Sequence, residues 1–193
     1  MEIKKYYIFI AVLLIALLSF STGTSADSGT GEKNSDILIT SVGQSADARM
    51  IKVVADKLQL ACDFEQLAKP DIIKNYKILV IVVGGSSKGL GAAGIDKEQE
   101  IVRAQELIKE AKVRGVKILV MHVGGEARRG VLSDAFLDEA VPYADHLIIV
   151  ENGNKDGYFT QISKEKEIPL EIVTKILATG ELMKGYFDNI LQK

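Results

Sequence analysis

Apolar runs alternate with polar stretches along the chain from residue 37 onward. The runs lie at residues 37–41, 62–67, 78–83, 117–123 and 146–150, and the second is the weakest. The stronger runs are rich in β-branched residues and apolar at successive positions, as are strands buried on both faces of a parallel sheet. A sixth run, at 168–173, contains Pro169. Proline cannot donate to a sheet ladder, so this run predicts an edge strand.

Segments with helical spacing lie between these runs. Apolar residues recur every three or four positions with charged residues on the other side, which predicts amphipathic helices. They are expected at residues 46–58, 97–114 and 133–144, with further helices at 158–165 and 180–191. Asp96 and Gln99 match a capping box for the second helix, and Ser133 is expected to cap the third. Residues 84–96 are interpreted as a long glycine-rich loop, because the helical pattern begins only near Asp96.

Strands that alternate with helices predict an α/β fold with helices on both faces of the sheet. We expect a three-layer, doubly wound, mainly parallel sheet of five to six strands. The expected order is 2-1-3-4-5 with the sixth strand at the edge, in a Rossmann-like or flavodoxin-like domain over residues 37–193. This order is favoured because ligands bind where the strand order reverses, and the loops after the first and third strands are rich in Gly and Ser.

The first 36 residues read as targeting and linker sequence. Lys4 and Lys5 precede an apolar run at 6–20 and small residues up to Ala26, the pattern of a secretory signal peptide over residues 1–26. Residues 27–36 form a polar linker. We expect an exported, extracytoplasmic protein, either secreted or held in the membrane by this segment if it stays uncleaved. The segment is the one expected contact with a membrane.

Charge and cysteine usage narrow the classes of partner. Residues 27–193 carry 22 basic and 25 acidic side chains. A net charge of −3 gives no reason to expect nucleic acid or an anionic membrane surface as partner. Cys62 lies in an apolar context and is expected to be buried. One cysteine and two histidines are too few soft ligands for a closed zinc site, so no metal or other cofactor is expected.

Glycine and polar residues gather in the loops that follow the strands. These loops span residues 42–47, 84–96, 124–130 and 151–157. The connections that lead from helix to strand show no such enrichment in glycine and polar residues. Because the carboxyl ends of parallel strands meet at one edge of the sheet, this bias predicts a binding site at the carboxyl edge.

Two motif strings overlap within residues 84–96. GSSKG at 85–89 matches G-x-S-x-G, which holds a catalytic serine where a helix follows at once. GLGAAG at 89–94 matches G-x-G-x-x-G, which binds dinucleotides directly after a strand. Each motif functions only where it directly joins a strand to a helix, and neither string is expected to lie in that position. The favoured interpretation is a loop whose backbone N–H groups converge on an anion.

The candidate ligand-binding residues supply hydroxyl, amide and cationic groups along this edge. They are Gln44, Ser45, Gly85, Ser86, Ser87, Lys88, His122, Arg128 and Arg129. Paired guanidinium donors suit a carboxylate or a phosphate. Simpler roles stay open: helix capping for Gln44 and Ser45, an ordinary polar loop for Ser86, Ser87 and Lys88, a core position for His122, and a solvated turn or a salt bridge for the arginines.

Several strings together resemble an uncharacterised family of exported bacterial proteins, a domain of unknown function. They are SVGQSAD, GGSSKGLGAAGID, HVGGEARRG, SDAF and ENGNKDGYF, within residues 36–188. The resemblance implies export and a Rossmann-like sheet. It implies no activity, so it assigns no catalytic residue.

Three functions are compatible with these observations. The first is an exported protein that binds a small anionic solute, a carboxylate or a phosphate, at the carboxyl edge of the sheet. The second is a hydrolase or transferase that uses His122 or Ser87. The third is an envelope protein-interaction module. The first expects the side chains of His122, Lys88 and Arg128 to converge, and the oligomeric state is left open.

Overall fold

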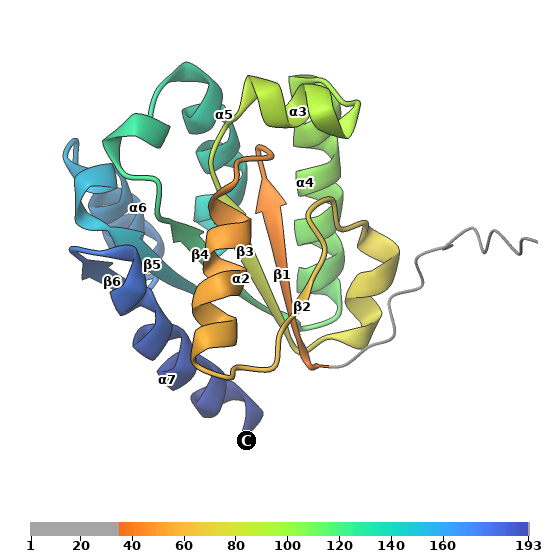
Figure 1. Cartoon of the computed structure of the whole chain (residues 1–193), viewed down its shortest axis with the longest axis vertical. Helices are drawn as coiled ribbons and strands as arrows, with labels where there is room; N and C mark the ends of the chain where they lie inside the picture. The colour runs from red at the N-terminus through yellow and green to blue at the C-terminus, as the bar shows by residue number, and fades with distance from the viewer. Residues whose placement is uncertain (1–34, 193) are drawn as a thin grey trace, which may run out of the picture. The chain divides into compact units, whose positions relative to one another are not determined.

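A six-stranded sheet runs through the computed structural model, which describes residues 35–192 (Figure 1). Every neighbouring pair of strands is parallel, in the order β2-β1-β3-β4-β5-β6. The strands are β1 (Ile37–Val42), β2 (Asp63–Phe64), β3 (Ile78–Val83), β4 (Lys117–His122), β5 (His146–Val150) and β6 (Leu170–Val173). The expected fold class and strand order, with the sixth strand at the edge, are confirmed.

Helices cover both faces of the sheet. They are α2 (Asp47–Lys57), α3 (Ser87–Ala93), α4 (Lys97–Val113), α5 (Val131–Ala140), α6 (Tyr158–Lys166) and α7 (Thr179–Leu191). Short 3-10 turns are η1 (Pro70–Asn75), η2 (Glu126–Arg128), η3 (Val141–Tyr143), η4 (Glu151–Asn154) and η5 (Ile176–Ala178). Figure 1 shows α2 and α7 in front of the sheet and α4 behind it.

The two faces of the sheet carry two separate apolar cores. Ile39 and Val80 pack on the side of α2 and α7, whereas Leu38 and Leu79 pack on the side of α4, α5 and α6. Successive residues of each central strand therefore point into opposite cores. This double burial explains why the strands read as continuous apolar runs rather than as alternating ones.

The described residues also bear on the expectations for the N-terminus and the cysteine. The predicted signal peptide, residues 1–26, lies outside the described residues, as does most of the predicted linker. Within residues 35–192, no helix has both the length and the apolar character needed to cross a membrane. Cys62 is buried, as expected, and burial raises the pKa of its thiol to about 12.

The expected start of α4 is confirmed, and that of α5 is wrong. Asp96 caps α4, and its carboxylate and the Gln99 side chain form the reciprocal capping box. For α5 the cap is Gly130, and Ser133 lies inside the helix. The Asp134 carboxylate accepts a hydrogen bond from the Gly130 N–H at 3.2 Å, and the Ser133 hydroxyl instead accepts one from the Gly85 N–H at 2.9 Å.

The segment 84–96, expected to be a loop, contains the helix α3. Ser86 caps it, because its Oγ accepts a hydrogen bond from the Gly89 N–H at 3.0 Å. Gly94 ends it with a φ of 69°, a left-handed conformation that favours glycine. The prediction failed because the glycines inside α3 weaken the helical pattern, although Ser86 is a typical cap.

Gly89 lets α3 lie against the loop that follows β1. A Cβ atom at Gly89 would stand 1.9 Å from the carbonyl oxygen of Gln44, a contact that no side chain tolerates. The two segments therefore touch through their main chains. This contact fixes α3 relative to β1.

We expect Gly89→Ala to destabilise the domain by about 3 kcal/mol, the upper end of the cost of overpacking, because the obstructing atom belongs to the main chain. Urea denaturation of the purified chain measures this change. Gly91→Ala is the matched control: apart from its chain neighbours and the backbone of its own helix, no atom lies within 4 Å of its Cβ position, and alanine favours a helix by about 0.5–1 kcal/mol. Equal stability of the two variants would contradict the proposed contact.

Candidate functional site

The loops after β1 and β3 are joined by main-chain hydrogen bonds where the strand order reverses. The Gly84 N–H donates to Val42 O at 3.0 Å, and the Ser86 N–H donates to Gly43 O at 2.9 Å. Gln44 pairs with Gly85 in an isolated bridge. These bonds join the two loops directly, beyond the ends of the parallel strands, so the two loops form one unit.

Gln44 adopts a backbone conformation that costs energy. Its φ is 58°, in the left-handed region, where residues other than glycine are uncommon, and it is 4% exposed. Such a conformation costs on the order of 1 kcal/mol and persists where surrounding contacts impose it. The contacts around Gln44 are therefore central to the shape of this edge.

A buried carboxylate supplies those contacts. Glu100, on α4, is fully buried, and its Oε1 accepts hydrogen bonds from the Gly43 N–H at 2.8 Å and from Gln44 Nε2 at 3.0 Å. The guanidinium of Arg103 donates to both oxygens of Glu100, at 2.7 and 2.8 Å. The charge of Glu100 is thus balanced inside the protein.

Arg103 also ties the end of β1 to the segment after β2. It donates to Ser41 O at 2.6 Å and to Ala68 O at 2.7 Å. The sequence pattern placed Glu100 and Arg103 on the charged side of an amphipathic helix. It did not predict that they form a buried ion pair that holds the end of β1 and the segment after β2. The available signal was their spacing of three residues, which is also common for ion pairs on exposed helices.

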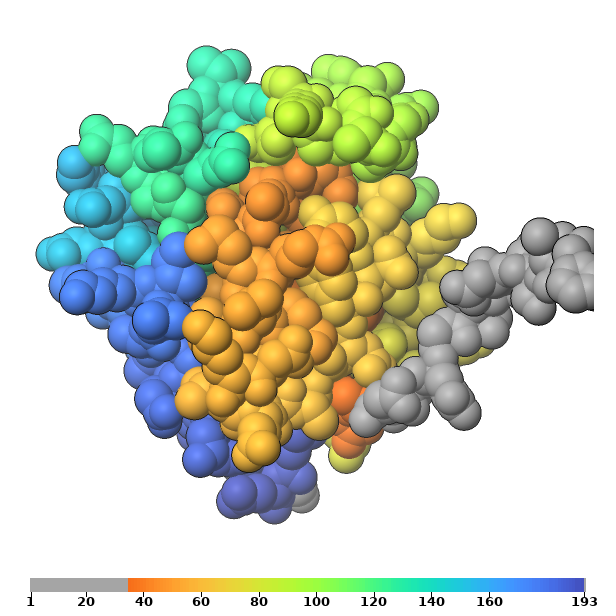
Figure 2. All heavy atoms as spheres, in the orientation of Figure 1, coloured from red at the N-terminus to blue at the C-terminus, as the bar shows by residue number. Residues whose placement is uncertain are grey.

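A groove of about 610 Å³ lies beside the joined loops. Its lining comes from the start of α2, the segment after β2, α3 and η2: Gln44, Ala46, Arg49, Gln66, Leu67, Ser86, Lys88, Gly89, Ala92, Ala93 and Arg128. In Figure 2 the lime atoms of α3 lie above the orange atoms of α2, with the teal atoms of the segment after β4 beside them. We call this hollow the switch-point groove.

Among residues 35–192, the charged side chains that line the switch-point groove are all cations. They are Arg49, Lys88 and Arg128, from three different segments. Arg49 lies over the ring of Phe64 at 5.2 Å, a cation–π contact that orients it. An anion in the groove would therefore lie in a hollow whose lining carries three positive charges.

The structure brings four of the nine candidate residues to the groove: Gln44, Ser86, Lys88 and Arg128. Ser45 is fully buried, and its Oγ accepts a hydrogen bond from the Asp47 N–H at 3.3 Å. Gly85 donates to the Ser133 hydroxyl. Ser87 is exposed in the first turn of α3.

His122 lies in the interior rather than in the lining of the groove. Its Nδ1 is 3.0 Å from Val83 O, its Nε2 is 3.3 Å from Gly125 O, and its ring stacks on Phe159. Burial lowers the pKa of His122 below its usual value of 6.5. Both ring nitrogens face main-chain carbonyl groups, and a neutral imidazole, which has one N–H, can donate to one of the two. The expected convergence of His122 with Lys88 and Arg128 is not seen.

Arg129 is engaged in internal ion pairs. Its guanidinium donates to Asp134 at 2.9 Å, to Asp156 at 2.8 and 3.0 Å, and to Gly153 O at 2.7 Å. This guanidinium holds the pKa of Asp156 below its usual value. Arg129 therefore fastens the loop after β5 to the loop after β4, and Arg128 alone of the two arginines lines the groove.

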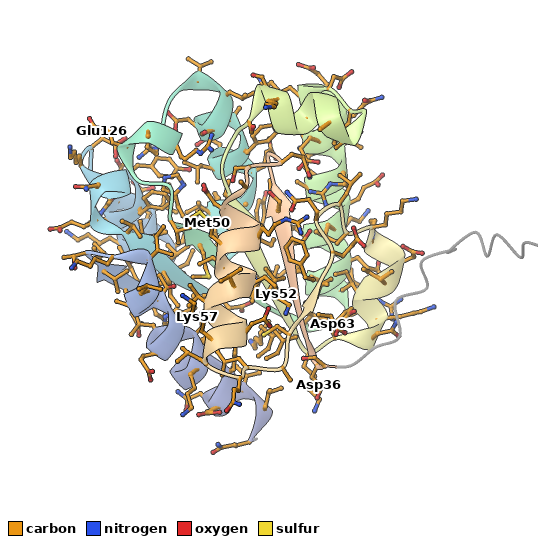
Figure 3. The ribbon with its side chains drawn as sticks, viewed as in Figure 1. Asp36, Met50, Lys52, Lys57, Asp63 and Glu126 are labelled. Atoms are coloured by element: carbon orange, nitrogen blue, oxygen red, sulfur yellow. The ribbon has the colours of Figure 1, made fainter. Side chains whose placement is uncertain are left out.

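A second hollow, of about 600 Å³, lies on the other side of η2. The loops after β4, β5 and β6 line it, with apolar side chains such as Ile176 and Leu177. Glu126, also in its lining, pairs with Lys155 and is labelled on η2 in Figure 3. The turn η2 thus separates a cationic groove from a more apolar hollow.

The chain belongs to the family described as Domain of unknown function (DUF6305), whose model matches residues 34–187. The resemblance to an uncharacterised domain family is thereby confirmed. No curated protein matches the chain.

One crystal structure that is similar to the chain is that of the psychrotrophic esterase EstA from Pseudoalteromonas sp., inhibited by monoethylphosphonate. The match has 14% sequence identity and a TM-score of 0.31, and it covers 73% of this chain and 78% of the esterase chain. A similarity of this size carries no argument about the activity of the chain.

We expect Glu100→Gln to lower the free energy of unfolding by about 3 kcal/mol, because it leaves the charge of Arg103 without its buried partner. Urea denaturation measures the loss. Glu98→Gln, an exposed position in the first turn of the same helix, is the matched control and should change stability by less than about 0.5 kcal/mol. A loss at Glu98 as large as that at Glu100 would refute the role of the buried pair.

Stability should also fall in mild acid because of the two histidines. Burial lowers the pKa of both His122 and His146 in the folded chain. The unfolded chain therefore binds protons first, and the free energy of unfolding decreases as the pH drops below about 6.5. The slope is at most about 1.4 kcal/mol per pH unit for each histidine, and it vanishes below the folded-state pKa. NMR titration of the imidazole protons checks this directly, and a value for His122 at or above 6.5 would contradict it.

Proposed function

We propose that the domain binds a small anionic solute, a carboxylate or a phosphate, in the switch-point groove. The observation that carries this proposal is the set of three cations, Arg49, Lys88 and Arg128, that line the groove from three segments. The chain as a whole has a net charge of −2, so this local excess of positive charge runs against the overall balance. The place of the groove agrees with the general position of ligands in doubly wound sheets.

Arg128 is the side chain best prepared to bind an anion. Its Nε lies 3.8 Å from Oδ2 of Asp47, and this distance is longer than a hydrogen bond. Its side chain is 37% exposed, so its planar donors remain accessible to a ligand. Arginine binds carboxylate and phosphate oxygens with two parallel hydrogen bonds, which gives direction as well as strength.

The cations alone support weak binding. A charge pair at about 4 Å in bulk water gives on the order of 1 kcal/mol. Three such pairs amount to about 3 kcal/mol, whereas a dissociation constant of 1 mM requires about 4 kcal/mol. A ligand bound tightly in this groove therefore needs further directed contacts.

The export expected from residues 1–26 complements this proposal. A solute encountered outside the cytoplasm reaches the groove directly, since the cationic side chains Arg49 and Lys88 are exposed. We propose accordingly that binding takes place outside the cytoplasm.

The alternative reaction at Ser87 or His122 receives less support from the geometry. Ser87 does open a helix soon after β3, as a hydrolase motif requires. However, a nucleophile elbow is a strained turn. Ser87 instead begins a capped helix, and it is not one of the described non-glycine residues with a positive φ, which are Gln44, Gln59 and Glu167. The two ring nitrogens of His122 face main-chain oxygens instead of Ser87.

We expect Arg128→Gln and Lys88→Gln each to weaken anion binding about fivefold, because each removes one of the three positive charges that line the groove, worth about 1 kcal/mol each. Thermal shift with a panel of inorganic phosphate, phosphate monoesters and short carboxylates identifies a ligand, and calorimetric titration gives its dissociation constant. Affinity for wild type should fall as salt rises, since the groove is open to solvent.

Lys109→Gln is the matched control, because Lys109 is an exposed lysine of α4 outside the groove lining and its loss changes the net charge equally. It should bind as wild type does. Absence of any stabilising anion, or equal binding by Arg128→Gln and wild type, would overturn the proposed function.

A further inference from the structure

We propose that the ligand of the switch-point groove is an anion that also carries a hydroxyl or ammonium group, and that Asp47 accepts a hydrogen bond from that group. This inference rests on the proposed function and names the class of ligand. It starts from a buried acceptor that the described part of the protein leaves unsatisfied.

Asp47, the first residue of α2, has a side chain only 6% exposed. Its Oδ2 is buried and has no hydrogen-bond partner in the described part of the chain. A buried carboxylate oxygen without a hydrogen bond is costly, and native proteins rarely retain one without a reason. The ion pair with Arg128 supplies attraction at 3.8 Å but no hydrogen bond.

The surroundings of this oxygen are built from the loops of three adjacent strands. A Cβ atom at Gly84, directly after β3, would stand 3.1 Å from Oδ2, and one at Gly124, after β4, would stand 2.6 Å from it. The acceptor thus lies where the ends of β1, β3 and β4 meet. Glycine at both positions brings the two loops up to the carboxylate.

Arg128 separates this acceptor from the groove. Its Cγ lies 2.0 Å from the Cβ position of Gly124, so the stem of the arginine rests directly on that glycine. The same side chain lines the groove. The proposal requires this one partly exposed side chain to rotate toward a bound anion, which would open a path from the groove to Oδ2.

These two neighbours impose opposite requirements on a ligand. Arg128, with Lys88 and Arg49, selects a negative group, whereas Asp47 repels negative charge and needs a donor. A plain carboxylate or alkyl phosphate meets the first requirement and leaves Oδ2 unpaired. A hydroxy acid, an amino acid or a hydroxylated phosphate ester meets both. A hydrogen bond to a charged acceptor corresponds to about a tenfold to hundredfold gain in affinity.

Matched pairs of probes test this selectivity. Calorimetric titration of the purified chain compares L- and D-lactate with propionate, and glycerol 3-phosphate with propyl phosphate. We expect the hydroxylated member of the pair that binds to do so at least tenfold more tightly. Asp47→Asn should reduce that ratio, and Asp47→Ala should bring it close to one while still binding the plain anion.

Asp56→Asn is the control, because Asp56 lies at the other end of α2, paired with Lys52, and should leave the ratio unchanged. A merely structural role of Asp47 would weaken both members of a pair equally and would not move the ratio.

The outcomes separate this inference from the function on which it rests. Equal affinity of wild type for both members, with Arg128→Gln weakening both, overturns the role of Asp47 and keeps the anion site. Absence of binding by every probe, together with a negative anion panel, overturns both. An unchanged ratio in Asp47→Ala also overturns the role of Asp47.

Discussion

The buried pair of Glu100 and Arg103 is the interaction on which the carboxyl edge depends. Taking two charges out of water is expensive, and the expense is tolerable only where each charge is matched and its remaining hydrogen-bonding groups are satisfied. Here the carboxylate also binds the loop after β1, and the guanidinium binds the carbonyl groups of Ser41 and Ala68. One ion pair on α4 thereby holds the ends of β1 and the segment after β2 in a single arrangement.

The groove follows from that arrangement. Gln44 keeps its left-handed backbone because Glu100 holds its side chain, and the carbonyl group of Gln44 then sets how closely α3 can approach. Lys88 and Ser86 are carried on α3, so their positions trace back to the buried pair. Arg128 belongs to a different segment, η2, and lines the same groove as Lys88 and Ser86. The cationic character of the groove thus arises from a fixed wall and one side chain that is less constrained.

The sequence was most informative where a single physical requirement acts. Strands buried on both faces must be apolar throughout, so β3 and β5 could be predicted to the residue, and the capping box of Asp96 identified the start of α4. It was less informative where two requirements compete. The glycines of α3 disfavour a helix but permit its contact with Gln44, and only the second requirement is visible in three dimensions.

The same limit explains the candidate site. Lys88 and Arg128 could be grouped from the topology, because the ends of parallel strands share an edge. The interior position of His122, the burial of Glu100 and the ion pair of Arg129 with Asp156 depend on distances between segments far apart in the chain. No local pattern encodes those distances.

The main-chain contact between Gly89 and Gln44 has a kinetic consequence. Because α3 rests on the main chain of Gln44 at that contact, the proposed solute would meet a wall of the groove that is already in place. The adjustment then left to the protein is the rotation of exposed side chains, which takes picoseconds to nanoseconds. Capture would therefore proceed in one step whose observed rate rises linearly with solute concentration, and residence time would depend on the contacts made and not on the opening of a gate.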